Sequence, residues 1–134
     1  MKSGPLLGIL LLLVGCGEYV GNSESIRHWF IDATDGSTLT IPPGKFEFDR
    51  SLVLRANNIS IVGAGQGRTV LSFHGQRQGA EGILLTGNGI RIEGLAVEDT
   101  VGDAIKINQS RDVVIRDVRV EWTRGSHTDN GAYG

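Results

Sequence analysis

Two neighbouring segments of the sequence, residues 89–100 and 112–123, repeat one aliphatic pattern at a constant offset in sequence number. At this offset each aliphatic position falls on another: Ile90 on Val113, Ile92 on Ile115, Leu95 on Val118 and Val97 on Val120. Alternation at period two is typical of a strand with one buried face. A fixed period in the twenties indicates a solenoid in which the strands of successive turns stack on one another.

The spacing between aliphatic residues widens from two to three between Ile92 and Leu95, and the second segment does the same. The pattern therefore predicts a bend at Glu93 and Gly94, and a second bend at the matching positions one turn later. Each repeat then consists of two short strands around a corner, with both aliphatic sets pointing into the interior. The predicted fold class is all-β.

An earlier part of the chain matches this region at a different offset. Leu54 and the five residues after it resemble Leu85 and the five after it, and the step from Leu54 to Leu85 is longer than the step from Ile90 to Val113. That turn is therefore longer, and we place the insertion at about residues 65–79. Asn57 and Asn88 would lie at equivalent corners, where Asn tolerates left-handed backbone and stacked Asn side chains can hydrogen-bond between turns.

A glycine-rich stretch, Gly-Ala-Gly-Gln-Gly at residues 63–67, follows one predicted strand. Such a loop binds phosphate when a helix N-terminus comes after it. Here residues 69–73 alternate as another strand, so we interpret the stretch as a turn. The formal net charge of the 134 residues is −2, which gives no electrostatic reason to expect a nucleic-acid partner.

The first sixteen residues combine Lys2, an apolar run over residues 6–14 and the only Cys of the chain, Cys16. The sequence Leu-Val-Gly-Cys resembles a bacterial lipoprotein signal, which implies cleavage before Cys16 and its lipidation. Gly17 rather than Asp follows, and this resembles the pattern sorted to the outer membrane, facing the periplasm. The alternative is an ordinary secretory signal with a chance Cys. Residues 1–15 are the predicted signal peptide, 16–31 a lipidated tether and N-terminal cap, and 32–134 the solenoid.

The cap is predicted over residues 26–31, Ile-Arg-His-Trp-Phe-Ile, as either a strand or a helical turn. Solenoid ends need such a cover because an open turn exposes unpaired backbone and apolar interior. The last predicted turn, near residues 118–122, has no cover in the sequence. We therefore expect the chain to self-associate through that edge.

The stretch from Thr38, with Pro-Pro-Gly at 42–44 and Ile-Val-Gly-Ala-Gly at 61–65, resembles the first turns of right-handed parallel β-helix proteins of the pectate-lyase-like superfamily. The resemblance covers about residues 32–134 and implies a right-handed parallel β-helix of about three to four turns. It also implies that the chain is an N-terminal piece of a longer protein. Members include polysaccharide lyases, epimerases and non-catalytic envelope proteins, so the resemblance is specific for fold and weak for activity.

The same constant offset stacks Glu98 on Glu121, and Asp99 and Asp103 lie beside them. Like charges at the spacing of adjacent strands repel unless a cation or an Arg intervenes. Clustered carboxylates are how proteins hold Ca²⁺, so these four residues form a candidate calcium site. The alternative is a solvated charged face without a ligand.

Lyases of the superfamily pair acidic Ca²⁺ ligands with a basic residue that abstracts a proton. Lys106 and Arg119 are the candidates for that base, and Trp122 is a candidate platform for a sugar ring. The sequence thus leaves two functions open. One is processing or binding of an acidic polysaccharide at the envelope, with lyase or epimerase activity only in a longer form. The other is a non-catalytic interaction or metal-handling module.

Overall fold

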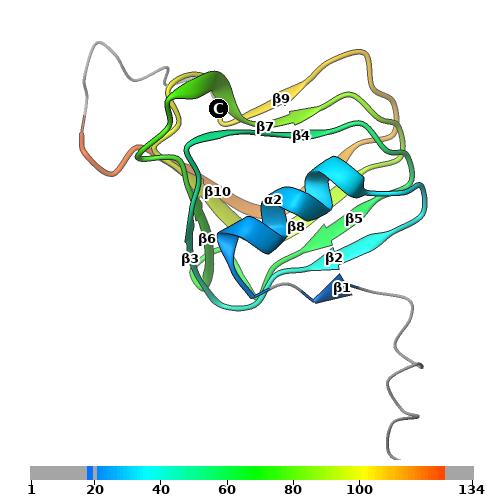
Figure 1. Cartoon of the computed structure of the whole chain (residues 1–134), viewed down its shortest axis with the longest axis horizontal. Coiled ribbons are helices and arrows are strands. Elements are labelled where there is room, and N and C mark those ends of the chain that lie inside the picture. The colour runs from blue at the N-terminus through cyan, green and yellow to red at the C-terminus, as the bar shows by residue number, and fades with distance from the viewer. Residues whose placement is uncertain (1–17, 20, 126–134) are drawn as a thin grey trace, which may run out of the picture.

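The computed structural model describes residues 18–19 and 21–125. In this part of the chain, parallel strands wind into a β-solenoid of about three turns, with one short helix covering one end (Figure 1). The elements are β1 (Glu18–Tyr19), α2 (Ser23–Asp32), β2 (Thr38–Thr40), β3 (Gly44–Glu47), β4 (Arg50–Leu54), β5 (Ser60–Val62), β6 (Thr69–Ser72), β7 (Gln78–Leu85), β8 (Arg91–Glu98), β9 (Ile105–Ile107) and β10 (Val114–Glu121). The prediction of an all-β solenoid is confirmed.

The strands form two sheets, and every pairing is parallel. One sheet has the order β1-β2-β5-β8-β6-β3, with β10 added on β8, and the other has the order β4-β7-β9. The first half of β8 pairs with β5 and its second half pairs with β6. Gly94 separates the halves with a φ of 73°, and Asp117 has a φ of 52° at the matching place in β10. The predicted bends are therefore present.

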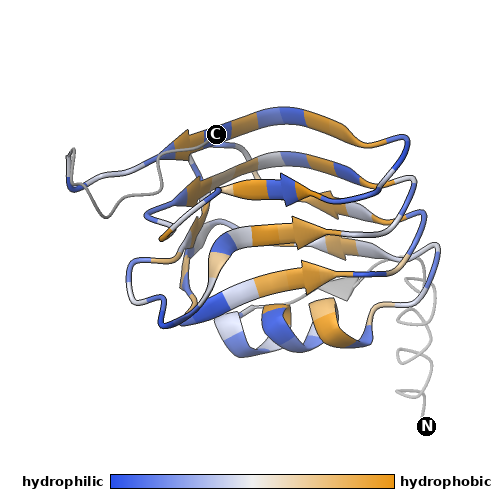
Figure 2. Ribbon diagram, turned by 90° about the horizontal axis from the view of Figure 1, so that it is seen from above, coloured by the Kyte–Doolittle hydropathy of each residue, from blue (hydrophilic) through white to orange (hydrophobic). Residues whose placement is uncertain are grey.

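The predicted registers are also confirmed. Ile92 pairs with Ile115 and Val97 with Val120, at the offset that the aliphatic repeat predicts. Leu54 pairs with Leu85, as the longer turn requires. Because the registers match, the aliphatic side chains of successive turns lie over one another, and they fill an interior that Figure 2 shows as stacked apolar bands.

The extra residues of the long turn lie in two places rather than one. The first is the corner from Gly63 to Arg68, which separates β5 from β6. In the next turn, β8 continues through the equivalent corner as a single strand. A Cβ at Gly63 would lie 2.3 Å from the backbone oxygen of Gly94, so this corner needs a residue without a side chain. The loop continues across the outer surface, where Gln66 Nε2 donates to Asp117 Oδ1 at 2.7 Å. No helix follows it, which confirms the interpretation as a turn.

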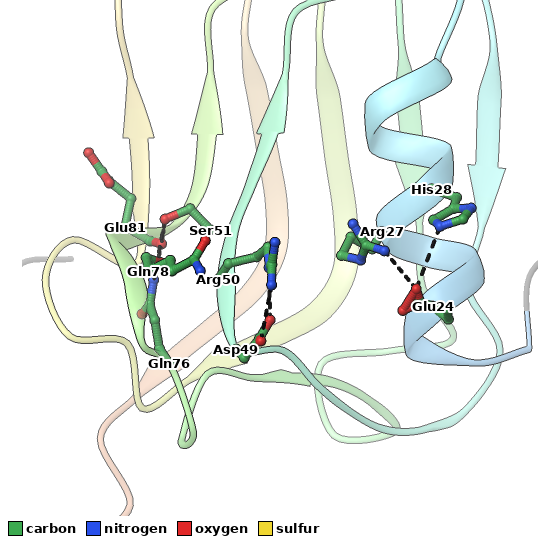
Figure 3. Close-up of polar contacts among 9 residues, drawn as sticks. All are labelled: Glu24, Arg27, His28, Asp49, Arg50, Ser51, Gln76, Gln78 and Glu81. Carbon is green, nitrogen blue, oxygen red and sulfur yellow. Dashed lines mark hydrogen bonds and ion pairs between the residues drawn. The ribbon is translucent and has the colours of Figure 1, made fainter.

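The second place is the loop between β6 and β7. Gln76 Nε2 donates to Ser51 Oγ at 3.2 Å and to the backbone oxygens of Gln78 and Glu81 at 3.2 and 2.9 Å (Figure 3). The Ser51 hydroxyl also donates to the backbone oxygen of Glu81 at 2.5 Å. These bonds hold the loop against β4.

A column of side-chain hydrogen bonds runs along one corner of the solenoid. Asp35 Oδ1 accepts from the backbone N–H of Asn57, Asn57 Oδ1 from that of Asn88, and Asn88 Oδ1 from that of Arg111, all at 2.8 or 2.9 Å. The predicted bonding between turns by Asn57 and Asn88 is confirmed. The left-handed backbone, however, belongs to the next residue of each corner: Gly36, Asn58, Gly89 and Asp112. Each Asn side chain serves as an acceptor while its successor makes the turn.

The cap is a helix, and it is longer than predicted. Asn22 is its N-cap, with Oδ1 accepting from the N–H of Ser25 at 2.8 Å, so three residues assigned to the tether belong to α2. Ile26, Trp29 and Phe30 are buried against the first turn. Glu18 and Tyr19 also join the fold, since β1 pairs with β2. A polar tether over these residues is therefore not what the structure shows.

Cys16 and the predicted signal peptide lie outside the described residues, and so do the last nine residues of the chain. Lipidation and cleavage therefore stay predictions. Within the described ranges, no helix combines the length and apolar character that crossing a membrane requires.

Candidate functional site

The stacked carboxylates predicted at the end of β8 and β10 are present, with an arginine between them. Glu98 and Glu121 are in register. Arg119 Nη1 lies 3.0 Å from Glu98 Oε2 and 2.5 Å from Glu121 Oε1. Its Nη2 donates to the backbone oxygen of Gln66 at 3.3 Å, so the glycine-rich loop covers this group. The Arg119 guanidinium thus offsets the repulsion between the two stacked carboxylates.

The other two predicted calcium ligands have separate roles. Asp99 accepts from the N–H and the hydroxyl of Thr123, both at 2.7 Å, and so caps the chain after β10. Asp103 lies in the loop before β9, where its backbone oxygen accepts from the N–H of Gly82 at 2.9 Å. Among the described residues, no group of three or more Asp, Glu, His and Cys side chains is close enough to hold a metal ion. The four carboxylates are therefore not gathered into one group in the described structure, and the calcium site stays a prediction.

The two candidate bases lie in different sheets. Lys106 is on β9, where its Nζ is 3.7 Å from Glu81 Oε1, whereas Arg119 is on β10. Both cations thus have carboxylate partners. The structure brings Arg119 together with Glu98 and Glu121, as the stacking implied, but it does not bring Lys106 to them.

Trp122 packs partly buried against the core, and its indole Nε1–H donates to the backbone oxygen of Thr100 at 2.8 Å. The ring is therefore held by the protein along one edge. Glu93 on β8 forms an ion pair with Arg116 on β10, with 3.9 Å between Nη1 and Oε2. These contacts stabilise the last turn.

A groove that the sequence analysis missed lies on the outer face of β5, β8 and β10. Its volume is about 290 Å³, and it is lined by Asn58, Ser60, Gly89, Ile90, Arg91, Asp112 and Val114. Ser60, Arg91 and Val114 lie over one another in register and form its wall. A Cβ at Gly89 would lie 2.5 Å from Asn58 Oδ1, so the glycine keeps the floor of the groove open. The sequence signal that could have indicated this groove was Arg91, which faces outward beside the predicted corner.

The polar groups of this groove differ from those around Arg119. Within the described part of the chain, the side chains of Asn58, Ser60, Arg91 and Asp112 have no ion pair and no hydrogen bond to the protein. Polar groups without protein partners are free to bind a ligand, whereas Arg119, Glu98 and Glu121 already pair with one another. The groove is thus the stronger candidate site.

A second cavity, of about 430 Å³, lies where the start of α2 meets the first turn. It is lined by Ser23, Glu24, Glu47, Phe48, Asp49 and Gly75. A hydrogen bond from Arg27 lowers the pKa of Glu24, and one from Arg50 lowers the pKa of Asp49 (Figure 3). Its acidic character opposes an anionic ligand, and two of its three carboxylates are already paired with arginines.

The fold and the groove define a class: a parallel β-solenoid, capped by a helix at one end, with a polar groove along one outer face. The chain matches no protein-family model, and searches of curated proteins and of solved structures found no significant match. The architecture therefore stands on the strand registers themselves.

Proposed function

We propose that this chain is a non-catalytic, glycan-associated module of the bacterial cell envelope, held at the outer membrane, facing the periplasm, through lipidated Cys16. The observation that carries the proposal is the groove over β5, β8 and β10, with four polar side chains that have no partner in the described protein. Arg91 supplies a planar donor for a carboxylate or hydroxyl, and Asp112 and Asn58 supply acceptors for hydroxyl groups.

The size and the composition of the groove favour a short stretch of polysaccharide. Its volume of about 290 Å³ is at the lower end of ligand sites, which suits a chain that passes over the surface rather than a buried molecule. The groove spans successive turns about 4.8 Å apart, so a ligand lying along the stack meets Ser60, Arg91 and Val114 in turn. One Arg beside one Asp suits a glycan that carries both carboxylates and hydroxyls.

The geometry supports binding rather than catalysis. Proton abstraction needs a base that is free to accept a proton near its substrate. Lys106 and Arg119 are each paired with carboxylates and lie in different sheets. We therefore expect no unsaturated product when the protein is incubated with pectate or alginate, with or without Ca²⁺.

Glycan binding is tested by titration with polygalacturonate, alginate and a neutral glucan. Arg91→Ala is expected to weaken uronate binding by about tenfold, since a charge-assisted bidentate contact contributes on the order of 1.5–3 kcal/mol. Arg55→Ala is the matched control, because Arg55 is exposed directly after β4 and does not line the groove, so its loss should change binding less than about twofold. Equal binding by the wild type and both variants, or no binding at all, would refute the proposal.

The anchor is tested separately. Globomycin treatment is expected to leave the precursor uncut, and Cys16→Ala is expected to release the protein from membranes. Recovery of the same soluble product from the wild type and Cys16→Ala would refute the anchor while leaving the groove untouched.

A further inference from the structure

Among the residues that the structure describes, none covers the apolar surface of the last turn, formed by β9, β10 and the loop before β9; we name it the open end. Five large hydrophobic residues are exposed among those that the structure describes, and four belong to it: Val101, Ile107, Val114 and Ile115. In the described chain, β10 pairs only with β8, and β9 only with β7. Both strands thus present a backbone edge ready to pair with another strand.

The opposite end of the solenoid is closed to such pairing. Helix α2 lies across it, as the side view of the stacked turns shows (Figure 2), and Ile26, Trp29 and Phe30 are buried. A head-to-tail contact would need that covered end, and it would grow into a filament. A contact between two open ends needs only the exposed surface and closes on itself.

We infer that two copies of this chain associate through their open ends as a closed twofold dimer, with β10 of one copy antiparallel to β10 of the other. A twofold axis that passes between Arg116 and Asp117 exchanges the two halves of β10. The first half of each strand then lies beside the second half of its counterpart, and β9 faces β9. The inference does not rest on glycan binding, but Val114 and Asp112 belong both to the groove and to this contact.

The sequence of β10 is self-complementary in this arrangement. The inward side chains are Val113 and Ile115 before the corner and Val118 and Val120 after it, as the registers with β8 and the packing against the core show. One antiparallel register places every inward residue opposite an inward residue: Ile115 opposite Val118 of the second copy, and Val113 opposite Val120. The apolar interiors of the two solenoids then cover each other.

Charges select the same register. It places Arg116 opposite Asp117 of the second copy, twice by symmetry, and the Arg116 side chain is 64% exposed in the single chain. A shift by two residues would place Arg116 opposite Arg119 and cost repulsion. The one like-charged outer pair, Asp112 opposite Glu121, lies at the strand ends, where Arg119 already pairs with Glu121.

The corner column disfavours the addition of a further parallel turn. Asp35, Asn57 and Asn88 each offer a side-chain oxygen to a backbone N–H of the next turn. Arg111 holds the equivalent position at the open end, and an arginine side chain has no acceptor. A parallel turn added there would lack the hydrogen bond that each earlier corner receives.

Sedimentation over a wide concentration range tests the dimer, in full-length chains with Cys16→Ser so that neither lipid nor that thiol interferes. The expected result is a monomer–dimer equilibrium without larger species. Ile115→Glu should raise the dimer dissociation constant at least about tenfold, because it places a charge in the paired apolar surface. Ile31→Glu, at an equally apolar residue exposed on α2, should change it less than about twofold.

Disulfide formation tests the register. Chains with Ile115→Cys mixed with chains with Val118→Cys should form a mixed disulfide dimer under mild oxidation, and neither should do so alone. Arg116→Asp tests the charges without touching the core. It should weaken the dimer, and the double change Arg116→Asp with Asp117→Arg should restore it. A monomer at all concentrations, a ladder of growing oligomers, or a dimer without the mixed disulfide would overturn the inference.

Discussion

The two ends of the solenoid contain the same kind of side chain in very different surroundings. Leu39, Ile61, Ile92 and Ile115 form a single column through β2, β5, β8 and β10. The first three are fully buried, whereas Ile115 is 43% exposed. The difference lies in what covers each turn, since β1 and α2 cover the first and nothing described covers the last. Burial in a solenoid is therefore decided by the neighbouring turn rather than by the strand itself.

The largest effect is expected at the capped end. Phe30 is only 3% exposed, and Phe30→Ala should lower the free energy of unfolding by about 3–4 kcal/mol, through lost burial and a cavity. Ile31→Ala, at the neighbouring residue on the exposed side of α2, should change it by less than about 0.5 kcal/mol. Urea denaturation measures both. Similar values for the two variants would mean that α2 does not stabilise the first turn.

Two substitutions within the column, at Ile92 and at Ile115, compare the stability contributed by a buried and by an exposed member. Ile92→Ala should cost about 3 kcal/mol, because Ile92 is fully buried between two turns. Ile115→Ala should cost about 1 kcal/mol at protein concentrations low enough to keep the chain monomeric, since nearly half of its surface already faces solvent. Equal costs under those conditions would show that the last turn is covered in solution.

The corner column is expected to have a smaller effect. Asn57→Ala removes the acceptor for the N–H of Asn88 and should cost about 1 kcal/mol. Asn108→Ala is the control, because Asn108 is exposed and its side chain makes no described hydrogen bond. The urea midpoint should shift for the first variant alone, with the slope of the transition unchanged.

The smallest effect concerns acid stability near the open end. Hydrogen bonds from its own backbone N–H and from that of Ala80, together with Lys106, lower the pKa of Glu81 below the ordinary value of 4.5. The folded state therefore binds fewer protons there than the unfolded state. This contribution is present above about pH 4.5 and is lost as the pH falls through the lower folded pKa. Glu81→Gln should flatten that part of the stability–pH curve, measured by thermal unfolding.

Repetition made the fold predictable. The aliphatic positions of 90–97 and 113–120, together with one widened spacing, led to the observed registers and corners. The cap was predicted as a feature but not in its extent. Asn22 with Ser25 three residues later is an N-cap signal that would have placed the start of α2 correctly.

The site was harder to predict because it depends on contacts outside the repeat. Arg119 is in register with Ala96, yet its long side chain reaches diagonally to Glu98 and along its own strand to Glu121. The loop that contains Gln66 contacts Asp117 of β10, although the two are far apart in the sequence. The repeat pattern does not predict this contact. To predict the groove, one must know that the polar side chains at the corner lack protein partners. Only a three-dimensional structure supplies that information.

The position of α2 in the chain has a consequence for how the protein is made. Residues near the N-terminus emerge first, from the ribosome and, in an exported protein, from the translocation channel, so the helix and the first turn are available before the later turns. Each later turn then pairs with the turn made just before it and covers it. At every stage only the newest turn has an unsatisfied edge. Because the cap is made first, the growing chain does not expose two unpaired sheet edges at the same time.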